Sequence, residues 1–192
     1  MGTILAVKKD KKICIAADCM TFSGGTRKQT AEYVSNYDKI FQYRENYMGI
    51  TGGTFPSWPL LFEDYFKQLK TPAKLNTREE IFRTFIKFHS ELKERYFLNP
   101  LDDDGDEFES SRFQTLLINP DGIFKVYQLR SVQQFSRFWA IGQGAPYALG
   151  AMEALYDQLA TPEEIAMQAL QATAAFDDST ALPATLYTVT SK

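Results

Sequence analysis

The stretch TILAVKKDKKICIAAD, residues 3–18, contains two short apolar runs separated by a run of charged residues. Apolar side chains dominate residues 3–7 and 13–17, and residues 8–12 are Lys-Lys-Asp-Lys-Lys. Two strand-like runs joined by a short polar turn are typical of a β-hairpin. We therefore expect the chain to begin with two antiparallel strands.

Farther along the chain, the same pattern predicts more strands. Residues 39–41 and 47–50 flank the polar residues 44–46 and predict a second hairpin, which ends at Gly52-Gly53. Two strands are predicted around the turn formed by residues 119–122, Asn-Pro-Asp-Gly, and a last strand over residues 184–189. Residues 19–35, rich in Thr, Ser and Gly, are predicted to form a loop.

Four helices are predicted between these strands. Apolar residues recur at helical spacing over residues 58–69, and a capping box at residues 77–80, Thr-Arg-Glu-Glu, begins a second helix. A third helix is predicted from about 145 to 156. A second capping box, residues 161–164, has proline at the first helical position and begins the fourth.

The order of elements decides the fold class. Pairs of helices stand between runs of antiparallel strands, whereas a parallel sheet would alternate one strand with one helix. We therefore predict an α+β fold, a four-layer αββα sandwich of two antiparallel sheets between helix pairs. No repeat or linker divides the sequence, so residues 1–192 are expected to form a single domain.

Composition argues against several classes of protein. The 21 basic and 24 acidic residues give a net charge of −3, and nucleic-acid-binding proteins usually carry a basic stripe instead. No apolar run approaches the roughly 20 residues of a membrane span. Cys14 and Cys19 are too few and too close for a disulfide framework, and they are typical of reduced thiols in a cytoplasmic protein.

Three features could carry chemistry, and each also has an ordinary structural explanation. Lys39 opens an apolar strand and could be held by Asp18, or it could be an exposed lysine. The amides at Gly52-Gly53 could face an oxyanion, or the pair could form a plain loop. The segment 142–144, Gly-Gln-Gly, could hold a phosphate or form a tight turn before a helix.

Taken in order, these motifs resemble those of one family. The segments that carry the resemblance are residues 2–7, 15–18, 38–40, 51–53, 141–144 and 177–189. They are similar to proteasome β subunits and to the bacterial peptidase HslV, most of all to the small bacterial proteasome homologues. The resemblance implies the Ntn-hydrolase fold and peptide hydrolysis by an N-terminal threonine.

The resemblance also implies roles for individual residues. Asp18 matches the acid that orders the active-site lysine, Lys39 matches that lysine, and the amide of Gly52 matches the oxyanion donor. Asp177 matches a second carboxylate near the α-amine of the nucleophile, and Thr180 stands where the family usually has serine.

Two positions depart from the family pattern. Gln143 replaces a common serine, which puts the hydroxyl relay there in doubt, and Gly2 stands at the nucleophile position. Glycine has no side chain that could attack a substrate. Thr3 could become the first residue after removal of two others, but strand alternation would turn it away from Asp18 and Lys39. The sequence leaves open whether glycine at this position is natural or introduced.

The remaining features predict neither a metal site nor a cofactor. His89, the only histidine, is expected to be a packed or surface residue on a face with Phe82, Phe85 and Ile86. The acidic run 101–107 is expected to be a solvated loop, because its glycine is misplaced for a calcium-binding EF-hand.

We therefore expect a subunit of a self-compartmentalising threonine peptidase that hydrolyses unfolded polypeptides and is itself inactive. The partners that the resemblance implies are identical subunits in a ring. It does not decide whether an ATPase caps that ring. No nucleic acid or membrane is expected as a partner. The expected location is the bacterial cytoplasm. Two alternatives remain, a non-catalytic structural ring subunit and a nucleotide-binding α/β domain built around residues 142–144.

Overall fold

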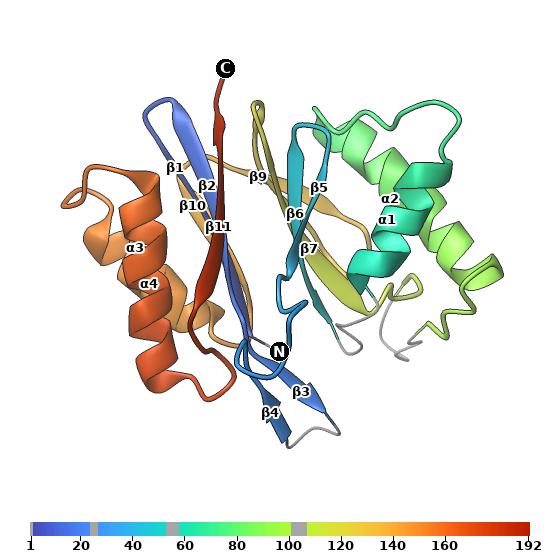
Figure 1. Cartoon of the computed structure of the whole chain (residues 1–192). Helices are drawn as coiled ribbons and strands as arrows, with labels where there is room; N and C mark the ends of the chain where they lie inside the picture. The colour runs from blue at the N-terminus through green and yellow to red at the C-terminus, as the bar shows by residue number, and fades with distance from the viewer. Residues whose placement is uncertain (1, 24–26, 53–57, 101–106) are drawn as a thin grey trace.

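The computed structural model describes residues 2–23, 27–52, 58–100 and 107–192. Over these residues the chain forms two larger antiparallel sheets, a short hairpin and four helices (Figure 1). The strands are β1 (Thr3–Lys9), β2 (Lys12–Asp18), β3 (Thr21–Ser23), β4 (Arg27–Gln29), β5 (Ile40–Tyr43), β6 (Asn46–Gly52), β7 (Phe113–Asn119), β8 (Gly122–Val126), β9 (Val132–Phe135), β10 (Phe138–Gly142) and β11 (Ala184–Thr190). The helices are α1 (Trp58–Gln68), α2 (Arg78–Glu94), α3 (Ala145–Leu155) and α4 (Pro162–Phe176).

The molecule has four layers, as Figure 1 shows. One sheet has the strand order β10-β1-β2-β11, and the other has β5-β6-β7-β8-β9. Helices α3 and α4 cover the outer face of the first sheet, and α1 and α2 cover that of the second. The predicted αββα sandwich is therefore confirmed.

Each layer boundary has its own apolar core. Ile4, Ile15 and Ile123 belong to the core between the two sheets, whereas Leu5 and Val7 pack toward α3 and α4. Because successive side chains of a strand point to opposite faces, a strand buried on both faces must be apolar throughout. This explains the continuous apolar run of β1 and fixes which face of the sheet each of its residues occupies.

Every strand pairing in the described residues is antiparallel, including β1 with β2, β1 with β10 and β2 with β11. The nucleotide-binding alternative required a parallel sheet, in which a helix crosses over between neighbouring strands. That alternative is wrong.

Two predictions of local structure were also wrong. Residues 21–23 and 27–29 pair as the hairpin β3–β4, where only a loop was expected. Strands β9 and β10 were not predicted. The strands β3, β4 and β9 are short and mostly polar, and the apolar β10 has only five residues and shows no clear alternation.

The helix starts follow the capping prediction closely. Thr161 accepts a hydrogen bond from the amide of Glu164, whose carboxylate accepts one from the amide of Thr161 in return. At α2 the Thr77 hydroxyl accepts from the amide of Glu80, but the Glu80 carboxylate accepts from Asn76 instead. The second predicted capping box is complete and the first is only half formed.

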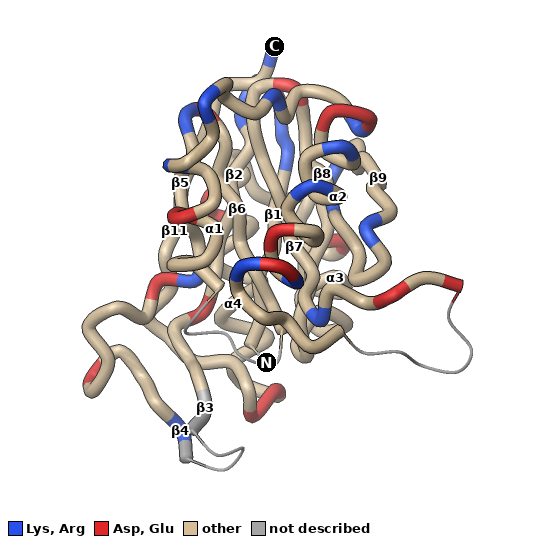
Figure 2. The backbone as a smooth tube through the Cα atoms, turned by 90° about the vertical axis from the view of Figure 1, so that its right-hand side faces the viewer, with Lys and Arg blue, Asp and Glu red and all other residues tan. Residues whose placement is uncertain are grey.

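The distribution of charge and the length of the helices can be compared with what nucleic-acid-binding and membrane-spanning proteins require. Basic and acidic residues are interspersed over the side of the molecule shown in Figure 2, and no basic face is visible there. None of the helices within the described residues combines the length and the apolar character needed to cross a membrane.

Candidate active site

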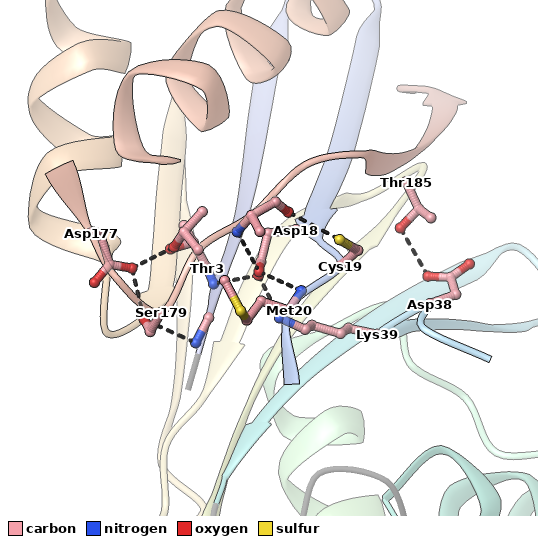
Figure 3. Close-up of polar contacts among 12 residues, drawn as sticks. Thr3, Asp18, Cys19, Met20, Asp38, Lys39, Asp177, Ser179 and Thr185 are labelled. Atoms are coloured by element: carbon pink, nitrogen blue, oxygen red, sulfur yellow. Dashed lines mark hydrogen bonds and ion pairs between the residues drawn. The ribbon is translucent and has the colours of Figure 1, made fainter. Parts of the chain in front are cut away.

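Asp18 is the last residue of β2, and its buried carboxylate accepts four hydrogen bonds. Oδ1 accepts from the amide of Thr3 at 2.7 Å and from Nζ of Lys39 at 2.5 Å. Oδ2 accepts from the amides of Met20 at 2.9 Å and Ala181 at 3.2 Å. Four donors thus satisfy both oxygens of a side chain that is buried. Figure 3 shows these contacts converging on Asp18.

Lys39 immediately precedes β5 and is buried, with 1% of its surface exposed. Its ammonium pairs with Asp18. Burial lowers the pKa of Lys39 from its ordinary value, and the charge of Asp18 acts in the opposite direction. Of the two interpretations offered for this residue, the exposed lysine is therefore wrong, and the lysine held by Asp18 is the one that the structure contains.

Gly2 lies at the start of β1, against this ion pair. A Cβ atom built on Gly2 would collide with Nζ of Lys39 and lie 2.6 Å from Oδ1 of Asp18. Any side chain at position 2 would therefore project directly onto the lysine and the aspartate. The φ angle of Gly2 is +91°, which is strained for residues other than glycine.

A second carboxylate lies on the other side of Gly2. The amide of Gly2 donates to Oγ of Ser179 at 3.3 Å, and Ser179 donates to Oδ2 of Asp177 at 2.7 Å. Thr180 donates to the same Asp177 oxygen at 2.5 Å. Asp177 and Ser179 appear beside Thr3 in Figure 3, opposite Lys39. Asp177 is thus linked to Gly2 through Ser179, a residue that the sequence analysis missed, and Thr180 links Asp177 to Thr3.

Thr3 faces away from the lysine. Its hydroxyl is within 2.7 Å of the Thr180 hydroxyl, and the residue is fully buried. Its partner across the sheet is Gly142 of β10. The orientation predicted from strand alternation is the one that the structure has.

The Gly-Gln-Gly segment packs against the beginning of β1. A Cβ on Gly142 would collide with the carbonyl oxygen of Gly2, and a Cβ on Gly144 would collide with the hydroxyl of Thr3. The amide of Gln143 donates to the Gly2 carbonyl at 2.9 Å, while its side chain is exposed. Gly142 is therefore explained by the close approach of two backbone segments and Gly144 by the close approach of side chains such as that of Thr3, which is the tight-turn interpretation.

Gly52 ends β6 and is paired with Phe113 of β7. A Cβ there would lie 2.8 Å from the carbonyl oxygen of Arg112, so only glycine fits without displacing that backbone. Gly52 and Gln143 line the same cavity, which places both at one end of the sandwich. Gly53 lies outside the described residues.

Asp38 was also missed, although it is next to Lys39 in the sequence. Oδ1 accepts from the amide of Ile40 at 2.9 Å and from the Thr185 hydroxyl at 2.9 Å, and Oδ2 accepts from the Tyr187 hydroxyl at 2.5 Å. Thr185 and Tyr187 belong to β11, which pairs with β2. Asp38 therefore ties the backbone beside Lys39 to the sheet that carries Asp18. Nothing in the local sequence marks this contact, because its partners are 147 and 149 residues away.

His89 does not belong to this cluster. Nδ1 of His89 is 2.9 Å from the Ser111 hydroxyl, and Nε2 is 3.4 Å from a Glu109 oxygen. His89 is buried, as one interpretation expected, whereas Phe82 and Ile86 on the same helix are exposed. Most of the acidic run, residues 101–106, lies outside the described residues. Within the described residues, no group of His, Cys, Asp and Glu is arranged to hold a metal ion.

Several solved structures are similar to this chain over nearly its whole length. The chain is 39% identical to BPH from Thiobacillus denitrificans in a complex with epoxomicin, covering 99% of both chains with a TM-score of 0.90. Another structure of BPH from the same organism is 40% identical over 99% of this chain and 98% of that chain, with a TM-score of 0.91. HslV from Trypanosoma brucei is 16% identical over 98% and 99% of the two chains, with a TM-score of 0.67, and shows the fold alone.

No protein-family model and no curated protein matches the chain. The fold and the likeness to BPH define the class, which is that of the Ntn hydrolases. The chain belongs to the family of proteasome-like β-type subunits, a threonine-peptidase family that includes HslV.

Proposed function

We propose that this chain is a subunit of a ring-shaped threonine endopeptidase that acts on unfolded polypeptides, and that the chain itself does not hydrolyse peptide bonds because Gly2 occupies the nucleophile position. One observation carries the proposal. The ammonium of Lys39 and the carboxylate of Asp18 lie directly in the path of a side chain at position 2. These are the groups that would activate a hydroxyl at that position.

The proposed chemistry needs a threonine at position 2 with a free α-amine. The amine takes the hydroxyl proton, and Lys39 stabilises the alkoxide, which attacks the carbonyl carbon of the peptide. The amide of Gly52 donates to the resulting oxyanion, a contribution of about 3 kcal/mol where one such donor has been removed in other enzymes. The departing amine receives the proton, and water then hydrolyses the ester.

The carboxylate of Asp177 has a separate role in this proposal. Through Ser179 it orients the nitrogen of residue 2, and through Thr180 it fixes the start of β1. Gln143 contributes its backbone amide, which holds the carbonyl of residue 2. A serine hydroxyl at position 143 is therefore not needed to position the nucleophile.

The second candidate is a non-catalytic structural subunit, and Gly2 itself favours it. The pair of Lys39 and Asp18 favours the peptidase site. A buried ion pair must overcome a desolvation cost of several kcal/mol per ion, and apolar residues of similar size often stabilise a fold equally well. A scaffold therefore has no structural need for this pair.

The proposal extends to the assembly and its surroundings. We place the chain, as one domain over residues 1–192, in rings of identical copies in the bacterial cytoplasm, where the free Cys14 and Cys19 stay reduced. An ATPase that delivers unfolded polypeptide to the ring is part of the same proposal. Native mass spectrometry tests the ring directly, because it counts the subunits in one particle.

The Gly2→Thr variant tests the site. The positive φ angle strains a threonine only while Met1 is attached, because a first residue has no φ angle. We expect the variant to lose Met1 and to hydrolyse a fluorogenic peptide and unfolded casein. The native chain and Gly2→Ala should hydrolyse neither substrate. Intact mass reports whether residue 2 is the first residue. A Gly2→Thr chain that has lost Met1 and cuts nothing would contradict the proposal.

A further inference from the structure

A cavity of about 390 Å³ opens at the same end of the molecule as the candidate active site. Its wall includes Gly52 and Gln143 from that site, and it continues to β7, β8 and β10. The side chains that matter for its chemistry are those of Gln114, Lys125 and Trp139. The cavity is therefore continuous with the site but extends away from Asp18 and Lys39, neither of which lines it.

Lys125 gives this cavity its charge. It lies on β8 opposite Leu116 and Gln133, and its side chain is partly buried. Its ammonium lies 4.0 Å from the ring centre of Tyr127 and 6.0 Å from that of Trp139. In the part of the chain that the structure describes, no carboxylate is within ion-pair distance of this ammonium.

Partial burial without a nearby negative charge disfavours the charged form of Lys125. Burial lowers the pKa of Lys125, and no carboxylate acts in the opposite direction as Asp18 does for Lys39. Lysines are seldom buried unless they are paired. The aromatic rings of Tyr127 and Trp139 attract the cation but leave its hydrogen-bond donors unused.

Trp139 also lines the cavity, and its buried indole nitrogen has no hydrogen-bond partner among the described residues. Buried polar groups in native proteins are nearly always hydrogen-bonded, so an unpaired one calls for an explanation. This nitrogen has less than 1 Å² exposed, so a ligand reaches it only if the ring moves. The donors of the cavity wall itself are the ammonium of Lys125 and the side-chain amide of Gln114. Together they suit a group that carries negative charge and accepts hydrogen bonds.

We propose that this cavity binds a carboxylate of the peptide substrate, carried by a glutamate or aspartate side chain close to the bond that the site addresses. The inference rests on the proposed peptide-binding function and names a preference of that site. Gly52 belongs to both the cavity and the site, so a peptide in contact with Gly52 brings its neighbouring residues to Lys125. Charge-assisted hydrogen bonds of this kind are about twice as strong as neutral ones.

The test measures binding, which does not need a nucleophile, so the native chain can be used. The probes are fluorescein-labelled alanine–glycine octapeptides with an amidated end and one glutamate, which is moved through the positions. A matched set carries glutamine. We expect one glutamate position to bind roughly tenfold more tightly than its glutamine counterpart, as anisotropy reports. A third set with a free terminal carboxylate and no glutamate shows whether the chain end can supply the group.

Three variants assign the preference to Lys125. Lys125→Met should remove it, Lys125→Arg should keep it, and Lys87→Met, an equal charge change on the exposed face of α2, should leave it unchanged. Circular dichroism shows that each variant is folded. Equal binding of glutamate and glutamine peptides by the native chain would overturn the inference, as would an unchanged preference in Lys125→Met. If the peptide that binds most tightly carries only a terminal carboxylate, the assignment to side chains is overturned. None of these three results depends on whether Gly2→Thr hydrolyses peptides.

Discussion

The ammonium of Lys39 stands in the space that the first side-chain atom of residue 2 would occupy at Gly2. Because glycine carries no such atom, the lysine approaches the backbone of β1 and pairs with Asp18 at 2.5 Å. A larger residue at position 2 requires the end of this flexible side chain to move aside, the Asp18 carboxylate to shift and the strained φ angle of residue 2 to be relieved. A threonine there is therefore expected to fit only after the lysine moves and Met1 is removed.

The ion pair should matter for stability. Asp18→Asn leaves Lys39 buried without its carboxylate, and removing one partner of a buried pair typically costs about 3 kcal/mol or more. We expect this loss in the free energy of unfolding measured with urea. The double variant with Lys39→Met should recover part of it, since no buried ammonium then remains to be desolvated. A loss in Asp18→Asn no larger than that of an exposed-site control would contradict the burial described above.

Asp38 should act as a positioning residue for Lys39. In the Gly2→Thr background, Asp38→Ala removes the contacts to Thr185 and Tyr187 and lets the backbone beside Lys39 shift. We expect kcat to fall about tenfold or more with little change in KM, because small displacements of catalytic groups are costly. Thr185→Val removes one of these contacts and should have a smaller effect. If Asp38→Ala and Thr185→Val lowered kcat by the same factor and stability by the same amount, the contact would instead be purely structural.

Tyr187 should make stability depend on pH in the alkaline range. The hydrogen bond to Asp38 raises the pKa of Tyr187 from 10.0 to about 12, and partial burial adds to the effect. The unfolded tyrosine therefore loses its proton first. Its contribution to stability is fully present below pH 10.0 and is lost as the pH rises toward about 12. The stability difference between the native chain and Tyr187→Phe should shrink over this interval, and a constant difference would refute the prediction.

Thr3 should not substitute for the missing nucleophile. A chain that begins at Thr3, released from a cleavable tag, should remain inactive because the hydroxyl is buried against Thr180 and faces away from Lys39. The matched control is a Gly2→Thr chain released in the same way, which should hydrolyse the peptide. Activity in the chain that begins at Thr3 would mean that β1 can slip by one residue, which would also turn Leu5 and Val7 out of their core.

Sequence alone predicted the layers and the register of β1, because strands buried on both faces leave long apolar runs such as residues 3–7. The resemblance also singled out Asp18 and Lys39, which the structure pairs, but the sequence did not predict that Lys39 is buried. Burial depends on an aspartate from another strand, 21 residues away. Ser179 and Asp38 were missed for the same reason, since hydroxyl and carboxylate groups gain their role only from partners that the fold brings together.

The short strands show a different limit. β9 has exposed glutamines at its centre and does not differ from a polar loop in sequence. β10, Phe-Trp-Ala-Ile-Gly, is apolar, but so short a run cannot be told from a buried helix segment by periodicity alone. β10 is nevertheless essential to the site, because it carries Gly142 against the backbone of Gly2.

The measurement that tests the central claim most directly compares Gly2→Thr with Gly2→Thr, Lys39→Met in a fluorogenic-peptide assay after intact mass has shown that both lack Met1. We predict hydrolysis by the first and none above the native chain by the second. Hydrolysis of equal rate by both chains, or by neither, would contradict an active site assembled around an empty nucleophile position.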